Sequence, residues 1–136
     1  MQVLTPSFEA NCYFGYLNVN LGLTLTNYNY ICINKDSNNH LLWVCAITLG
    51  NYELFIDHYS TSPYFLNRKL IKDFFDFCFS LKPRCSCLIA EDNIKSRKLV
   101  ERLGFKQEGI NRKSFDGIKN TISYGLLKEE FINKWR

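Results

Sequence analysis

The last third of the chain carries a strand-like apolar run followed by a helical spacing of apolar residues. The run is 88–90, and three later residues share one helix face: Leu99, Val100 and Leu103. Asn93 suits the helix N-cap, because its side-chain oxygen can accept an N–H group of the first turn. Gly104 suits the left-handed residue that ends a helix. The pattern predicts a strand that leads into a capped helix of about three turns.

Two runs with strand character follow the predicted helix, one up to Phe115 and one from Ile118. Asp116 and Gly117 lie between them, and Asp-Gly is among the strongest dipeptide signals for a two-residue hairpin turn. The chain is therefore expected to form a hairpin that turns at these two residues.

The first half of the chain alternates strand-like runs with turn residues. Met1–Leu4 predicts a short strand, and Phe8–Leu25, after the helix-start signal Thr5-Pro6, predicts one short helix or an irregular segment. Three longer runs separated by polar turn residues predict an antiparallel meander: Tyr28–Lys35, His40–Leu49 and Tyr52–Tyr59.

A second helix is expected to start at Ser62-Pro63, after the meander. Four apolar residues then recur at i+4 spacing: Leu66, Leu70, Phe74 and Cys78. Lys82-Pro83 ends this helix, and Cys85–Ala90 predicts the strand that leads into the last third. The order of elements predicts a mixed α/β fold, with a mostly antiparallel sheet flanked by helices.

Composition indicates one soluble domain, which we expect to span residues 1–136. Hydrophobic residues make up 46% and charged residues 22% of the chain, which is typical of globular proteins. No apolar run approaches the ~18 residues of a membrane span, and the N terminus lacks the basic region and apolar core of a signal peptide. We therefore expect a cytoplasmic protein without membrane attachment.

The six cysteines lie mostly within apolar runs, and none forms a C-x-x-C or zinc-type pattern. We expect reduced thiols and no metal.

The net charge is +4, and all of the excess lies in the last third: residues 1–90 hold six Lys/Arg and six Asp/Glu, and 91–136 hold eleven and seven. The excess either covers solvated surfaces or serves an anionic ligand. No basic run with interleaved aromatic residues indicates nucleic acid.

The last third also carries a motif, N-x-x-S-x-x-L-x-x-x-L-G-F followed by x-x-E-G-x-x-R, D-G and Y-x-L-L-x-x-E. It resembles the C-terminal half of GNAT-superfamily N-acetyltransferases, particularly the branch that acetylates ribosomal-protein N termini. The resemblance implies acetyl-CoA as cofactor and an amine acceptor, with a protein N terminus as one option.

The resemblance also implies where the cofactor would bind. Family members hold its pyrophosphate with Q/R-x-x-G-x-G/A at the helix after the fourth strand, because glycines let backbone N–H groups approach the phosphates. Here 59–69 contains no glycine. The candidate cofactor residues are Asn93, Ser60, Thr61, Ser62, Arg68 and Lys69. The hydroxyl and cationic residues among them also fit a helix cap and a solvated helix face.

Acetyl transfer needs a base for the amine proton and an acid for the departing thiolate. In many family members a tyrosine acts as the general acid, and Val100 occupies the matching position here. The resemblance therefore makes Ser96 the candidate acid. Glu53 is the candidate base, and Asp57 and the pair 91–92 are further candidates. The two histidines are expected at strand ends on the surface: His40 and His58.

Two functions remain open at this point. One is an N-acetyltransferase that acts on a protein or small-molecule amine. The other is a catalytically inactive protein of the same fold, similar to GNAT-like internal virion proteins of phages, which would place it in a virion or host cytoplasm. The missing glycines and the short N-terminal region favour the second, and the motif of the last third supports the fold in both.

Overall fold

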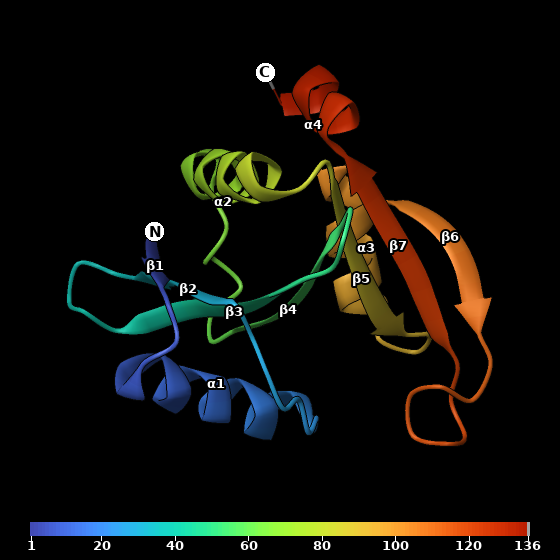
Figure 1. The fold of residues 1–136 in the computed structure, drawn as a ribbon, viewed down its shortest axis with the longest axis horizontal. Helices are drawn as coiled ribbons and strands as arrows, with labels where there is room; N and C mark the ends of the chain where they lie inside the picture. The colour runs from blue at the N-terminus through green and yellow to red at the C-terminus, as the bar shows by residue number, and fades with distance from the viewer. Residues whose placement is uncertain (136) are drawn as a thin grey trace.

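The structure, a computed structural model, describes residues 1–135. This part of the chain forms a seven-stranded sheet with four helices (Figure 1). The elements are β1 (Gln2–Leu4), α1 (Phe8–Leu21), β2 (Tyr30–Lys35), β3 (Leu41–Leu49), β4 (Leu54–Ser60), α2 (Arg68–Leu81), β5 (Arg84–Ala90), α3 (Ile94–Leu103), β6 (Lys106–Asn111), β7 (Thr121–Leu127) and α4 (Lys128–Trp135).

The strands lie in the order β1-β2-β3-β4-β5-β7-β6. β4 and β5 pair in parallel, and the other neighbours pair antiparallel. A parallel pair needs a long crossover, which here runs through α2. The prediction of a mixed, mostly antiparallel sheet flanked by helices is confirmed. The prediction of a single domain stays a prediction.

Helices cover the two faces of the sheet unequally. α1 packs on β2, β3 and β4 through a small core: Ala10, Leu17, Ile31, Ile33, Val44 and Ala46. A larger core joins the opposite face to α2, α3 and α4, and includes a cluster of rings: Phe74, Phe75, Phe79, Phe105 and Phe131. α1 lies beneath the meander half only (Figure 1), so the same face of β5 stays open, and Leu88 is 58% exposed there.

α2 begins later than the predicted start at Ser62-Pro63. Asn67 is the N-cap, with a side-chain oxygen that accepts the N–H of Leu70 at 2.8 Å, and the first helical residue is Arg68. Asparagine is at least as good an N-cap as serine. Residues 61–67 therefore form a loop between β4 and α2.

α3 has the predicted caps. Asn93 accepts the N–H of Ser96 at 3.3 Å, and Gly104 ends the helix with a φ of 108°. The hairpin that follows turns less tightly than predicted, because residues 112–120 form a wide loop instead of a two-residue turn. Asp116 lies in this loop, where its carboxylate accepts two backbone N–H groups, and Gly117 has a φ of 85°.

Further sequence-based expectations concern cysteines and membranes. All six cysteines are free, and five of them are buried, which agrees with reduced core thiols. Within residues 1–135, no helix is both long enough and apolar enough to cross a bilayer.

β4 and β5 start side by side and then part. They pair only at Leu54 with Cys85 and at Phe55 with Ser86. β4 pairs with β3, and β5 with β7, along their whole lengths. Beyond Phe55 the two strands diverge (Figure 1). Beyond this point the backbone N–H and C=O groups that β4 and β5 turn toward each other are not paired between the two strands. A ligand can hydrogen-bond to such groups.

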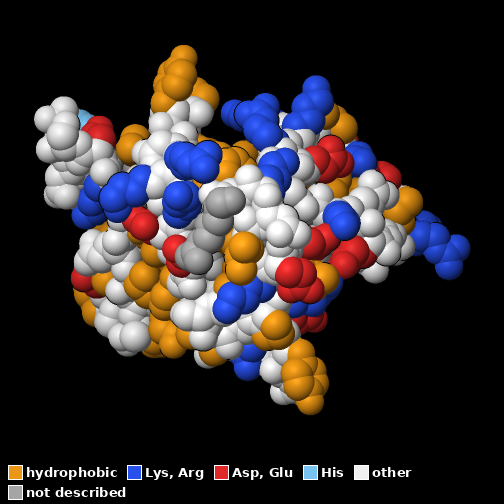
Figure 2. All heavy atoms as spheres, turned by 90° about the horizontal axis from the view of Figure 1, so that it is seen from above, with side chains coloured by type: hydrophobic (Ala, Val, Ile, Leu, Met, Phe, Trp, Pro, Cys, Tyr) orange, Lys and Arg blue, Asp and Glu red, His pale blue; other side chains and the backbone are white. Residues whose placement is uncertain are grey.

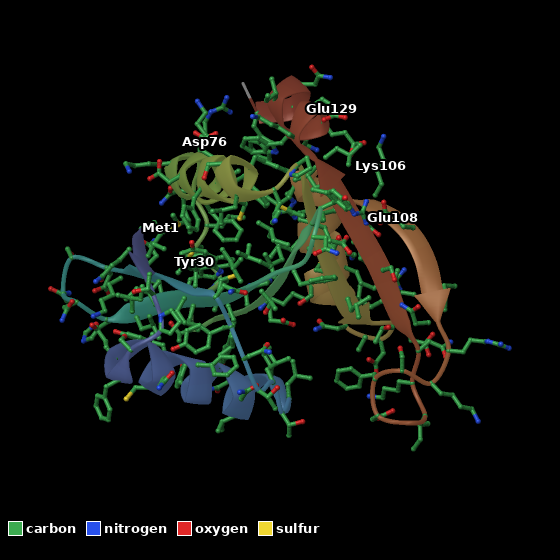
Figure 3. All side chains as sticks on the ribbon, in the orientation of Figure 1. Met1, Tyr30, Asp76, Lys106, Glu108 and Glu129 are labelled. Carbon is green, nitrogen blue, oxygen red and sulfur yellow. The ribbon has the colours of Figure 1, made fainter. Side chains whose placement is uncertain are left out.

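A network of charges holds the paired end together. The Arg84 guanidinium donates to Glu53 at 2.9 Å and to Glu108 of β6 at 2.7 Å, and the Ser86 hydroxyl donates to Glu53 at 2.6 Å. Glu108 lies beside the upper part of β7 (Figure 3). Gly125 leaves room for the network, since a Cβ there would lie 2.6 Å from the Glu108 carboxylate. The network ties the start of β4 to β5 and β6.

Glu53→Gln should lower the free energy of unfolding by about 1–2 kcal/mol, because it weakens two hydrogen bonds to a charged, half-buried carboxylate. Hydrogen bonds from Ser86 and Arg84 hold the pKa of Glu53 below its ordinary value. The carboxylate therefore stabilises the fold above its ordinary pKa, and this contribution is lost as pH falls through the lowered value. Urea denaturation at pH 7 measures the change. Glu129→Gln, at an exposed position, is the control and should cost less than about 0.5 kcal/mol. Equal losses in both variants would contradict the network's role.

Candidate active site

Three cavities border β4, and His58 lines all of them. The helix cavity, about 510 Å³, lies between the loop after β4 and α3. The core cavity, about 40 Å³, lies between α2 and α3. The strand cavity, about 130 Å³, lies between β4 and β5 and reaches Leu21 at the end of α1, Leu23 after it, and Phe115 of the hairpin loop. The largest falls within the ~300–1,000 Å³ of small-molecule sites.

Three cations of α3 border the helix cavity: Lys95, Lys98 and Arg102. Their i, i+3 and i+7 spacing places them on one face of the helix. Among residues 1–135, none of the three forms an ion pair or side-chain hydrogen bond. Figure 2 shows Lys and Arg side chains projecting from the face seen from above. The cavity is thus bordered by positive charge that an anion can neutralise.

Arg97 of the same helix has a different role. Its guanidinium donates to the hydroxyl of Tyr124 at 3.1 Å and to the carbonyl of Glu91 at 2.9 Å. It therefore connects α3 to β7 and β5 and does not line the cavities.

The hydroxyl residues expected to bind phosphate are partly used within the loop. Thr61 donates its hydroxyl to the carbonyl of Leu41 at 2.6 Å, and the Ser62 hydroxyl accepts the N–H of Tyr64 at 3.1 Å. Ser60 ends β4 and lines the helix cavity. Of the three, Ser60 is therefore the one that the structure places at the cavity.

The two cations expected to bind phosphate on α2 lie elsewhere. Arg68 donates to the carbonyl of Trp135 at 3.2 Å and stacks over its indole ring at 6.0 Å. Lys69 pairs with Asp73 at 2.6 Å on the exposed side of the helix. Neither lines the helix cavity, so the cations that border this cavity come from α3 and not from α2.

The strand cavity brings together a carboxylate, an amide and a hydroxyl: Asp57, Asn93 and Ser96. Asp57 lies on β4, and the other two lie at the start of α3. Burial raises the pKa of Asp57 above its ordinary value, because desolvation disfavours the charged carboxylate. A carboxylate with a raised pKa next to an open cavity suits proton transfer.

His58 is not the surface residue that the sequence predicted. Its Nδ1 is buried and has no hydrogen-bond partner among the described residues. The ring lies 6.2 Å from that of Phe65, and burial lowers the pKa of His58 to about 4. The imidazole is therefore neutral at pH 7, and the residue lines all three cavities. His40, in contrast, is exposed as predicted.

Glu53, the predicted base, lies at the paired end of β4 and β5, away from the strand cavity. It directly precedes β4, and its pKa is lowered by its hydrogen bonds to Ser86 and Arg84. A lowered pKa makes a carboxylate a weaker base. Asp57, the second candidate on the same strand, lies in the cavity itself. The sequence alone could not show which of these two carboxylates lies at the cavity, because it does not show how far β4 and β5 stay paired.

Glu91 and Asp92, the remaining candidates for a base, are both bound to neighbouring side chains. Glu91 accepts the side-chain amide of Asn120 at 3.1 Å, and Asp92 pairs with Lys119 at 2.8 Å. Both hold the hairpin loop against the start of α3. No group of three or more His, Cys, Asp or Glu side chains suited to a metal ion occurs in residues 1–135.

Several solved structures share this fold. A point variant of spermidine N-acetyltransferase SpeG from Vibrio cholerae superposes with a TM-score of 0.78 at 15% identity, and the match covers 100% of both chains. A dodecameric form of the V. cholerae enzyme gives a TM-score of 0.71 at 16% identity over 99% of both chains. No family model or curated protein sequence matches the chain. The chain therefore has the GNAT fold of N-acetyltransferases, as its C-terminal motif predicted.

Asp57→Asn should make the protein more stable at neutral pH. A raised native pKa means that the carboxyl stabilises the fold only below its ordinary pKa of 3.8 and loses that contribution as pH rises through the native value. The gain should therefore shrink between pH 7 and pH 4, as measured by urea denaturation.

Asp73→Asn is the matched control. Lys69 lowers the pKa of Asp73, so this variant should lose stability at pH 7, the opposite sign. An Asp57→Asn variant that is less stable than wild type at pH 7 would show that the carboxylate is bound by the fold and not held open in the cavity.

Proposed function

We propose that this protein is an N-acetyltransferase that transfers an acetyl group from acetyl-CoA to an amine. One observation carries the proposal: the parting of β4 and β5 places Asp57, with its raised pKa, beside Asn93 and Ser96 in an open cavity. The likeness of the whole chain to acetyltransferases supports it at the level of the fold.

The residues present fit acetyl-CoA, although by an unusual arrangement. Its phosphates are anions, and Lys95, Lys98 and Arg102 border the helix cavity without partners among the described residues. Its pantetheine arm carries amides, and we assign His58 to such a group, because this residue lines the cavities and its Nδ1 has no hydrogen-bond partner among the described residues. Ser60 adds a hydroxyl to the wall. Acetyl-CoA supplies an activated acetyl thioester.

The chain's own residues have distinct roles in this proposal. Asp57 accepts a proton at its carboxylate from the ammonium form of the acceptor. Ser96 holds a proton on its hydroxyl that it can donate to the leaving sulfur, the role that the motif resemblance implies. Asn93 caps α3 and so fixes the position of Ser96.

One observation favours the second function, an inactive protein of the same fold. Residues 61–67 contain Pro63 and no glycine, and the Thr61 and Ser62 hydroxyls are used within the fold. A role in a phage virion, a cytoplasmic location and a protein N terminus as acceptor all stay predictions. Binding of acetyl-CoA separates the two functions.

We predict that acetyl-CoA binds through the cations of α3. Removing one charge-assisted hydrogen bond costs about 1.5–3 kcal/mol, less at an exposed, salt-screened site. Lys98→Ala should therefore raise the Kd about 3- to 10-fold, and the Lys95→Ala, Lys98→Ala double variant more than about 10-fold. Calorimetric titration measures both, and the affinity should fall with added salt.

Lys69→Ala is the control for this titration, because Lys69 lies on the exposed side of α2 and should leave the Kd unchanged. If the wild type and the double variant bind acetyl-CoA with equal affinity, the phosphates do not bind at the cations of α3. An absence of binding at millimolar acetyl-CoA would leave the inactive protein as the better function.

Asp57→Asn should lower kcat/KM for acetyl transfer by about 10²–10⁴, the usual contribution of a general base. Its affinity for acetyl-CoA should stay the same, because the carboxylate faces the acceptor and not the phosphates. Asp73→Asn should keep full activity. The rate of the wild type should rise with pH as Asp57 ionises. A fully active Asp57→Asn variant would exclude Asp57 as the base.

A further inference from the structure

The strand cavity has walls that restrict the acceptor. Its apolar members come from several parts of the chain. They include Leu21 at the end of α1 and Leu23 after it, Leu88 and Ile89 on β5, and Phe115 in the hairpin loop. Of the described residues that line it, Asp57 alone carries a carboxylate. The cavity therefore offers one site for an ammonium group, surrounded by apolar surface.

Two of the apolar residues face water at the cavity. Leu88 is 58% exposed, whereas its strand neighbours Cys87 and Ile89 are 7% and 9% exposed. Phe115 is 42% exposed in the hairpin loop. An apolar group that enters the cavity covers both side chains and gains the free energy of removing them from water.

Charge restricts the acceptor further. The helix cavity shares His58 and Ser96 with the strand cavity, and its other side carries Lys95, Lys98 and Arg102. A polyamine bound at Asp57 would place its second ammonium either against apolar walls or toward these cations. Neither location offers a second carboxylate, and an unpaired buried charge is costly.

We propose that the acceptor is a primary amine attached to an apolar group, and not a polyamine; this inference rests on the proposed N-acetyltransferase function. A new bond forms between the amine nitrogen and the acetyl carbon, and the C–S bond of the thioester breaks. The ammonium nitrogen loses two protons in all. One passes through Asp57 to solvent, and the other ends on the sulfur of coenzyme A.

The test compares four acceptors with the wild-type protein and acetyl-CoA, with products identified by mass spectrometry. They are 2-phenylethylamine, the tripeptide Phe-Gly-Gly, ethylamine and spermidine. We expect kcat/KM for 2-phenylethylamine to exceed that for ethylamine and for spermidine at least ten-fold. An equally good tripeptide would extend the site to peptide N termini, and a poor one would assign it to small amines. Spermidine or ethylamine as the best acceptor overturns the inference.

A pair of variants tests the wall itself. Leu88→Asp adds a second carboxylate to the cavity, and Ile110→Asp makes the same change at a 57% exposed strand position outside it. Leu88→Asp should weaken the binding of 2-phenylethylamine at least ten-fold, measured by NMR titration without acetyl-CoA, and should raise the activity ratio of spermidine to 2-phenylethylamine. Ile110→Asp should change neither. If Leu88→Asp does not fold, Leu88→Thr takes its place, because threonine is favoured in strands. It should also weaken the binding of 2-phenylethylamine.

The outcomes separate this inference from the function on which it rests. If acetyl-CoA binds but the apolar amines are not preferred, or if Leu88→Asp binds 2-phenylethylamine as well as the wild type does, the acceptor inference fails alone. If acetyl-CoA does not bind, the proposed function and the acceptor inference fail together.

Discussion

The parting of β4 and β5 after Phe55 is the constraint on which the site depends. Two parallel strands in the middle of a sheet normally satisfy each other's backbone groups. Here they do so at only two positions, after which each strand is held by its outer neighbour alone. The network around Arg84 fixes the paired end. The sheet can therefore stay open at its centre without coming apart, and the cavities follow from that opening.

The opening also explains how Asp57 and His58, which are neighbours on β4, can both line the strand cavity. Side chains alternate between the two faces of a strand. His58 lies toward α2, beside Phe65, and Asp57 lies toward the α1 side, where Leu21 and Leu23 complete the wall. In a closed sheet these two residues would be separated by backbone. Both carry costs that a purely structural core would avoid, an unpaired Nδ1 and a desolvated carboxylate. Such costs are typical of sites that await a ligand.

Local signals predicted most of the fold, and non-local pairing limited the prediction of the site. Asn93 and Gly104 were recognised because capping depends on a few adjacent residues. The start of α2 was misplaced because Ser62-Pro63 and Asn67 are both good local signals, and packing decides between them. Glu53 lies directly before β4 and Asp57 lies on it, four residues apart, and the point where β4 leaves β5 decides which of them faces a cavity. His58 was missed for the same reason, since its burial depends on Phe65 in the following loop.

The structure also shows where the excess positive charge of the last third of the chain lies. Several of its cations are bound to acidic partners, as Lys106 is to Glu130 and Lys119 is to Asp92. Lys95, Lys98 and Arg102 have no such partner in the described chain, and all three border one cavity. Other cations of the last third, such as Lys128 and Lys134, also have no acidic partner in the described chain, so only part of the excess lies at this cavity. The loop before α2 lacks glycines and uses its hydroxyls internally, so anion binding at this fold has a route through side chains of α3 in place of backbone N–H groups of α2. Flexible lysines hold an anion less rigidly than a backbone loop does, and salt screens them more readily.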